Sequence, residues 1–347
     1  MPLLPLCGRS VLLVLAAPLL AVSGQTQTLD DPDHRIRAAF DAAVQHATRL
    51  PRLHSLLVSR GAETIVEEYF NGSSPSAPAN IKSASKSVIS ALVGIAIEQG
   101  HIASVGQEIG EYFEDLDDPR KAAITVEDLL TMRSGLETTS NRNYGAWVLS
   151  RSWVEFALLQ PLEHAPGLYM EYSTGNTHLL SAILTAATGQ TTLEFAREAL
   201  SEPLGFRLLE WPQDPQGVHF GGNDMQMTPR QMLAFGQLYM NEGRANGKQI
   251  VPLDWVRASL EPRTESRREA GRWYGYGWWI RRMAGLRTPY AWGYGGQFIL
   301  LVPDLKVVVV TTSDSTPGAD RRSQRRAILD LIENDIVAPA ARMAGPD

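Results

Sequence analysis

The chain has few thiols and no long apolar segment. Its single cysteine, Cys7, lies in an N-terminal segment that we expect to be removed. The mature protein would then form no disulfide and perform no cysteine chemistry. The apolar run Val11–Val22 is shorter than the roughly 20 residues that a membrane-spanning helix needs. We therefore expect no stable membrane span after cleavage.

Several active-site patterns are also missing. The seven histidines include no His-x-x-x-His pair, and zinc would lack cysteine ligands. There is no P-loop, and no Gly-x-Ser-x-Gly elbow of the kind that carries the nucleophile in α/β-hydrolases. We expect neither a metal nor another cofactor.

Composition and charge fit an ordinary globular protein. Of the 347 residues, 44% are hydrophobic and 20% are charged, which is enough chain for a large core or two lobes. The net charge of −6 becomes −7 once Arg9 is lost. A basic run near the C-terminus fits the solvated face of a helix and does not indicate a nucleic-acid partner: Arg321, Arg322, Arg325 and Arg326.

Residues 1–24 have the pattern of a secretory signal peptide. Arg9 precedes the apolar run, and Ala21-Val22-Ser23 offers small residues for cleavage before Gly24. Cys7 precedes the apolar run, which is the wrong place for a lipid anchor. We predict that the protein is secreted to a bacterial periplasm.

Strand-like and helical patterns are arranged unevenly along the chain. We predict strands at residues 53–59, 63–70, 274–280, 297–302 and 307–312, and helices at 33–50 and 322–336 around a mostly helical middle. This order predicts an α/β (α+β) fold, in which both chain ends build one antiparallel sheet flanked by helices. The predicted sheet lobe is 30–82 with 271–340, the mainly helical lobe is 83–270, and the active site lies between them.

Ser83 and Lys86 are the most informative pair. Three residues apart at the start of an apolar helical stretch, they lie on the same helix face, where the amine reaches the hydroxyl. The amine accepts a proton only when burial or a nearby cation depresses its pKa. The alternative interpretation is that Ser83 caps a core helix and Lys86 is solvated.

Two later segments offer groups that such a pair needs. Tyr172, exposed on a loop just before a helix, would carry a proton to the leaving group, although its ring could instead simply pack. The glycine-rich segment from Ala291 to Gln297 leads into a strand and would supply a backbone N–H for an oxyanion hole. A plain glycine-rich turn is the alternative there.

The ordered motifs Ser83-x-x-Lys86, Tyr172-Ser-Thr and Trp292-Gly-Tyr-Gly-Gly resemble those of the penicillin-binding-protein-like serine hydrolases. The nearest branch groups class C β-lactamases, D-aminopeptidases, esterases and 6-aminohexanoate-dimer hydrolases. Flanking stretches at 124–135, 203–206 and 227–239 are similar too. The resemblance implies a β-lactamase/transpeptidase-like fold.

The resemblance also implies roles for individual residues. Ser83 would be the acylated nucleophile, Lys86 its activator, and Tyr172 the group that protonates the leaving group and later activates water. The backbone N–H groups of Ser83 and of Gly296 or Gln297 would form the oxyanion hole.

The chain departs from the family pattern in two places. Thr174 stands where the tyrosine motif often has asparagine, and Asn176 lies two residues further on. Trp292 and its glycines replace Lys-Thr-Gly, so we expect no efficient β-lactam turnover. Nearby aromatic residues would line a cleft or pack in strands. Four arginines could bind a substrate carboxylate in place of the missing lysine, or lie on a solvated loop: Arg263, Arg267, Arg268 and Arg272.

We therefore predict a secreted serine hydrolase that cleaves a small-molecule or peptide-like ester or amide, such as a D-amino-acid peptide or a linear amide. The alternative is a non-hydrolytic sensor that binds β-lactams or cell-wall peptides and is acylated at Ser83. The sequence predicts no particular oligomeric state.

Overall fold

The computed structural model of the chain describes residues 32–113 and 116–344, so the predicted signal peptide lies outside the described residues. Its main feature is an eight-stranded antiparallel sheet with the order β2-β1-β12-β11-β10-β9-β8-β7. The strands are β1 (Leu53–Arg60), β2 (Glu63–Tyr69), β3 (Ala79–Asn80), β4 (Gln226–Met227), β5 (Arg244–Ala245), β6 (Lys248–Gln249), β7 (Thr264–Glu265), β8 (Trp273–Tyr274), β9 (Trp279–Met283), β10 (Leu286–Gly293), β11 (Gln297–Val302) and β12 (Val307–Ser313).

Helices flank the sheet and fill the middle of the chain. The α-helices are α1 (Pro32–Ala47), α2 (Ser85–Glu98), α3 (Pro119–Ala122), α4 (Val126–Leu130), α5 (Tyr144–Val148), α6 (Trp153–Leu159), α7 (Thr174–Thr188), α8 (Thr192–Ala196), α9 (Pro229–Met240), α10 (Leu253–Leu260), α11 (Arg321–Leu331) and α12 (Ala338–Ala344). Short helical turns of other types are η1 (Lys82–Ala84), η2 (Ile109–Glu111), η3 (Arg197–Ser201), η4 (Pro303–Leu305) and η5 (Ile332–Val337). None of the helices in the described residues is long and apolar enough to cross a membrane.

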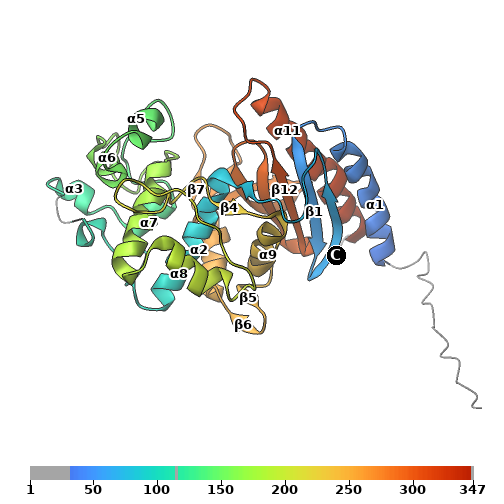
Figure 1. Cartoon of the computed structure of the whole chain (residues 1–347), viewed down its shortest axis with the longest axis horizontal. Coiled ribbons are helices and arrows are strands. Elements are labelled where there is room, and N and C mark those ends of the chain that lie inside the picture. Colours follow the sequence, from blue (N-terminus) through green and yellow to red (C-terminus); the bar gives the residue numbers. More distant parts are fainter. Residues whose placement is uncertain (1–31, 114–115, 345–347) are drawn as a thin grey trace, which may run out of the picture.

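The central strands are apolar on both faces because both faces of the sheet are covered. In β12, Val308 and Val310 join the core on the side of α2 and α9, whereas Val307 and Val309 join the core against α1 and the C-terminal helices. Figure 1 shows α1 and α11 on one side of the sheet and α2 and α9 on the other. Period-two alternation of strand side chains thus builds two cores from one valine run.

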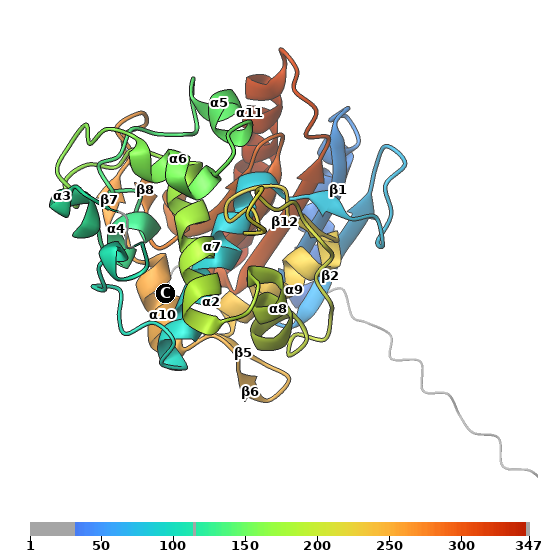
Figure 2. The same ribbon diagram turned by 60° about the vertical axis from the view of Figure 1, so that its left-hand side comes forward.

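The sheet confirms the predicted fold class, since β1 and β2 from the start of the chain pair with strands from its end. β1 pairs with β12 in antiparallel register, joining Leu57 to Val310. The mostly helical residues between them include α2 and α7, which lie side by side (Figure 2). The lobe boundaries at residues 82 and 270 stay a prediction.

Local signals place several helix starts correctly. Thr125 and Asp128 form a reciprocal capping box at α4, and Thr228 and Gln231 form one at α9, where Pro229 occupies the first helical position. Each cap satisfies backbone N–H groups that a helix start leaves without partners.

Two strand predictions are wrong. The predicted strand at 274–280 is two strands, β8 and β9, because the chain turns between them. Gly275 donates its N–H to Trp278, and Gly277 has φ +76°. The other error is an omission: β10 was not predicted as a strand, since Pro289 interrupts the strand pattern. The predicted helix at 322–336 continues to Ala344.

The start of α2 carries Ser83 and Lys86, and its interior is fixed by close packing. A Cβ added at Gly94 would lie 2.3 Å from the Trp255 ring of α10. We expect Gly94→Ala to lower the free energy of unfolding by about 1–3 kcal/mol, because overpacking outweighs the gain in helix propensity. Denaturant titration measures this.

The matched control is Gly145→Ala in α5, where an added Cβ meets no atom within 4 Å. It should stabilise the protein by up to about 1 kcal/mol. Equal effects at both positions would contradict the packing argument.

Candidate active site

Ser83 lies in the helical turn η1, directly before α2. Lys82, the residue before it, has φ +50°, an uncommon value for a residue with a side chain. Two contacts hold this turn: Lys82 Nζ lies 2.8 Å from an Asp224 carboxylate oxygen, and the Lys82 N–H donates to the Asn80 side chain at 3.0 Å. Asn80 in turn donates to Asp224 at 2.7 Å. The backbone around Ser83 is therefore fixed by three polar side chains.

Lys86 is 1% exposed, and its amine lies among neutral groups. Its Nζ donates to the Gly222 carbonyl at 2.6 Å and lies 3.3 Å from the hydroxyls of Ser83 and Thr174. Burial lowers the pKa of Lys86 to about 7, because an ammonium group loses its hydration there. The alternative interpretation of a solvated Lys86 is wrong.

Tyr172 precedes α7 and faces the same point. Its ring stacks on Trp279 with centroids 5.4 Å apart and meets Tyr274 edge-on at 6.1 Å, so it is not the exposed loop residue that the sequence predicted. Lys86 Nζ lies 5.1 Å from its ring centroid. Burial raises the pKa of Tyr172 above the usual phenol value, although a hydrogen bond with Ser83 and the charge of Arg272 oppose this.

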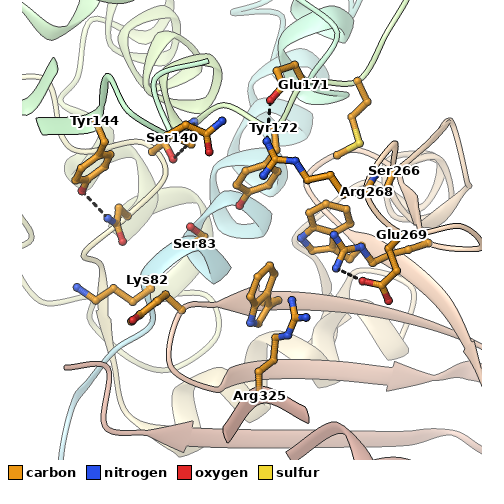
Figure 3. Close-up of a pocket in the computed structure, with 18 of the residues that line it drawn as sticks. Lys82, Ser83, Ser140, Tyr144, Glu171, Tyr172, Ser266, Arg268, Glu269 and Arg325 are labelled. Carbon is orange, nitrogen blue, oxygen red and sulfur yellow. Dashed lines mark hydrogen bonds and ion pairs between the residues drawn. The ribbon is translucent and has the colours of Figure 1, made fainter. Parts of the chain in front are cut away.

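Figure 3 shows Ser83 and Tyr172 pointing toward one another at the edge of a pocket of about 1000 Å³. The structure thus brings together the three residues that the sequence predicted as catalytic. The spacing of Ser83 and Lys86 places both on one helical turn, whereas Tyr172 comes from a distant segment.

The glycine-rich segment is only partly at the pocket. A Cβ at Gly293 would meet the Ile81 carbonyl oxygen at 2.0 Å, so glycine there lets β10 approach the Ser83 turn. Trp292 lines the pocket, but Gly296 and Gln297, predicted for the oxyanion hole, do not. The chain turns at Gly295 and Gly296, with φ +89° and +109°, before β11 begins.

Gln297 is fully buried in a different network. Its side-chain amide donates to the Ser313 carbonyl at 2.6 Å, and its side-chain oxygen accepts from the Ser313 N–H at 3.2 Å. A Cβ at Gly296 would meet Ile328 at 2.4 Å. Both positions thus serve the packing of β11 against β12 and α11.

Thr174 and Asn176 also differ in placement. The Thr174 hydroxyl lies 2.8 Å from that of Ser140, and its N–H donates to Ser140 at 2.7 Å. Thr174 and Ser140 line the pocket, whereas Asn176 is buried within α7 and accepts from Ser134 at 3.0 Å. The sequence analysis missed Ser140, which no local motif marks.

The pocket wall is cationic. Five lining residues carry positive charge and two carry negative charge: Lys82, Arg267, Arg268, Arg272 and Arg325 against Glu171 and Glu269. Arg272 pairs with Glu269 at 2.8 Å, and Arg268 pairs with Glu171 at 3.3 Å (Figure 3).

Two of these arginines are held against tryptophans. The Arg272 guanidinium lies 4.2 Å from the Trp279 ring centroid, and that of Arg325 lies 5.1 Å from Trp292. Arg325 makes no ion pair within the part of the chain that the structure describes. Sequence analysis assigned Arg325 to a solvated helix face, which is wrong because it lines the pocket. Arg263 instead pairs with Glu127 at 3.1 Å and does not line the pocket.

Comparisons with known proteins agree with this architecture. The family model described as Beta-lactamase matches residues 40–333. The 6-aminohexanoate-dimer hydrolase of Paenarthrobacter ureafaciens is 27% identical over 245 residues, 62% of this chain and 61% of that protein.

Two solved structures share the fold. A Bacillus anthracis protein provisionally named a 6-aminohexanoate-dimer hydrolase has a TM-score of 0.71 at 22% identity, over 85% of this chain and 80% of that one. An octameric penicillin-binding protein homologue from Pyrococcus abyssi has a TM-score of 0.67 at 17% identity, over 85% and 76%. With a family model that matches most of its length, this chain belongs to the beta-lactamase family and is a serine hydrolase.

Proposed function

We propose that this hydrolase cleaves an ester or amide through an acyl-enzyme on Ser83. The observation that carries the proposal is the 3.3 Å separation between the Ser83 hydroxyl and a buried Lys86 amine whose pKa is lowered to about 7. A lysine that is partly neutral at neutral pH can take the proton of a serine hydroxyl.

In the first half of the reaction, Lys86 accepts the Ser83 proton as the serine oxygen bonds to the substrate carbonyl carbon. The Tyr172 phenol, kept protonated by its raised pKa, gives its proton to the leaving group as the old ester or amide bond breaks. The proton on Lys86 then returns to the Tyr172 oxygen. In the second half the same groups activate water, which releases the acid and restores Ser83.

Two backbone N–H groups would stabilise the oxyanion. One belongs to Ser83. The other comes from the end of β10, at Ala291–Gly293. β9 pairs with β10 only as far as Tyr290, so within the described chain the edge of β10 beyond Tyr290 has no strand partner on that side. Trp292 at this edge lines the pocket beside Ser83.

The cationic wall supports a substrate that carries a carboxylate. Arg325 lines the pocket and has no ion-pair partner among the described residues. Guanidinium groups bind carboxylates through paired N–H donors. A relative named for the 6-aminohexanoate dimer, an amide of an amino acid, fits this chemistry.

Export of the protein stays part of the proposal. The predicted signal peptide at 1–24 supports secretion to a bacterial periplasm, where peptide-like amides and esters would be substrates. The missing Lys-Thr-Gly motif supports substrates other than β-lactams.

Replacing the nucleophile tests the mechanism. We expect Ser83→Ala to lower kcat/KM for a chromogenic ester by up to about a millionfold, because no other hydroxyl takes its place. The control is Ser85→Ala, since Ser85 is buried two residues on and its hydroxyl has no hydrogen-bond partner among the residues that the structure describes. Full activity of the Ser83→Ala protein would refute the acyl-enzyme.

The pH dependence tests the role of Lys86. Since only the neutral amine accepts a proton, kcat/KM for a neutral ester should rise as pH increases through about 7. None of the residues that line the pocket is a histidine. Initial rates between pH 5 and 9, corrected for spontaneous hydrolysis, measure the rise. A flat profile over this range would contradict the assignment.

The carboxylate subsite is tested with two matched esters, p-nitrophenyl glutarate and p-nitrophenyl valerate. Arg325→Gln should lower kcat/KM about 10- to 100-fold for the glutarate, because a charge-assisted contact is lost, and leave the valerate rate unchanged. Arg326→Gln, at an exposed neighbour on α11, is the control. Equal losses of kcat/KM for both esters would show that Arg325 does not bind the substrate carboxylate.

A further inference from the structure

His178 is a fully buried side chain that the proposed reaction does not use. It lies on α7, one turn after Thr174, with its ring enclosed by Trp147, Trp153 and Phe220 at centroid distances of 5.4–6.1 Å. Its two nitrogens make different contacts. Nε2 lies 3.1 Å from an Asp214 carboxylate oxygen, and Nδ1 accepts from the Gly221 N–H at 3.5 Å.

These contacts fix the tautomer of the imidazole. The backbone N–H of Gly221 can only donate, so Nδ1 must present its lone pair. The ring proton is then on Nε2, where it is donated to the Asp214 carboxylate. The ring therefore links a carboxylate acceptor at Asp214 to a backbone donor at Gly221.

Both partners belong to one segment, residues 211–222, which crosses α7 and which we call the strap. Its first end is anchored at Asp214, whose other carboxylate oxygen accepts from the N–H groups of Gln216 and Val218, both at 2.9 Å. Burial works to raise the pKa of Asp214, but these bonds and the contact with His178 outweigh it and lower that pKa. Asp214 is thus a charged anchor with three donors.

The other end of the strap reaches the active site. The Gly222 carbonyl accepts from Lys86 Nζ at 2.6 Å, the shortest of the three contacts of that amine. A Cβ at Gly221 would lie 2.1 Å from the Thr177 carbonyl oxygen, and one at Gly222 would lie 2.8 Å from Lys86 Nζ. With no side chains here, the strap depends on backbone contacts for its position.

Only a few polar contacts tie this end of the strap to α7. The Ser181 hydroxyl donates to the His219 carbonyl at 2.8 Å, and His178 accepts from Gly221, the residue directly before Gly222. Among these contacts with α7, the histidine contact is the one nearest to the carbonyl that holds Lys86. On the other side of that carbonyl, the Asn223 side chain donates to the Tyr144 hydroxyl at 3.0 Å.

We propose that His178 is a positioning residue for the reaction: with its ring oriented by Asp214, it accepts from the Gly221 N–H and so fixes the Gly222 carbonyl against the Lys86 amine. The inference rests on the proposed function, in which Lys86 is the proton acceptor. A strap that moves away would leave Lys86 without its shortest contact and admit water beside it. Hydration would let the amine keep its proton to a higher pH.

Two substitutions separate the two contacts of the ring. The side-chain oxygen of asparagine can take the place of Nδ1, so His178→Asn keeps an acceptor for Gly221. The side-chain nitrogen of glutamine can take the place of Nε2, so His178→Gln keeps only the donor to Asp214. Both lose the aromatic packing, so loss of stability alone would affect them alike.

We expect His178→Gln to move the midpoint of the pH profile upward by about one unit and so to lower kcat/KM at pH 7 by about fivefold. His178→Asn should keep the wild-type midpoint. His219→Gln is the control, since this buried histidine lies on the same strap but its side chain contacts Gln213 and Trp211 instead. It should also keep the midpoint.

A measurement without turnover separates this inference from the proposed function. The chain has five lysines, so the Lys86 amine can be followed by ¹⁵N NMR titration in the Ser83→Ala background, with Lys86→Met for assignment. The midpoint should be higher with His178→Gln than with His178→Asn. Equal midpoints in all variants would overturn the positioning role. Activity that survives Ser83→Ala would overturn the proposed function instead.

Discussion

The burial of the Lys86 amine is the constraint on which the rest of the site depends. An ammonium group away from water is costly unless it is paired with a carboxylate, and such a partner would keep it charged. Here the neighbours are two hydroxyls and the Gly222 carbonyl, and no carboxylate among the described residues makes an ion pair with it. The neutral surroundings hold the amine in place without stabilising its charge.

This constraint determines how the backbone is arranged. Three segments contact Lys86 Nζ: the turn before α2, the start of α7 and the strap. Each of them places a small residue there, namely Ser83, Thr174 and Gly222. Gly222 touches Lys86 where any Cβ would collide, and Gly293 brings β10 against the Ser83 turn in the same way. The sheet and the helical residues are thus joined closely at the point where the proposed chemistry occurs.

The sequence predicted those features that local patterns determine. Runs of strand-forming residues predicted β1, β2, β11 and β12, and a three-residue spacing predicted that Ser83 and Lys86 meet on one turn. Pro289 and the glycines between β8 and β9 interrupt such patterns, so that part of the sheet was misjudged. Ser140, Gly222 and Arg325 reach the site from segments far apart in the chain, and nothing near them in sequence signals their position.

The chain lacks the usual lysine of the third motif, and arginines elsewhere carry the positive charge of the pocket. A lysine on β10 would place a mobile charge beside the serine, whereas Arg272 and Arg325 hold planar charges against Trp279 and Trp292. The positive charge therefore lies on the pocket wall, where Arg272 directly precedes β8 and Arg325 belongs to α11. Ser83 and both arginines line the same pocket of about 1000 Å³. Under the proposed function, this arrangement would suit an extended acyl chain that ends in a carboxylate.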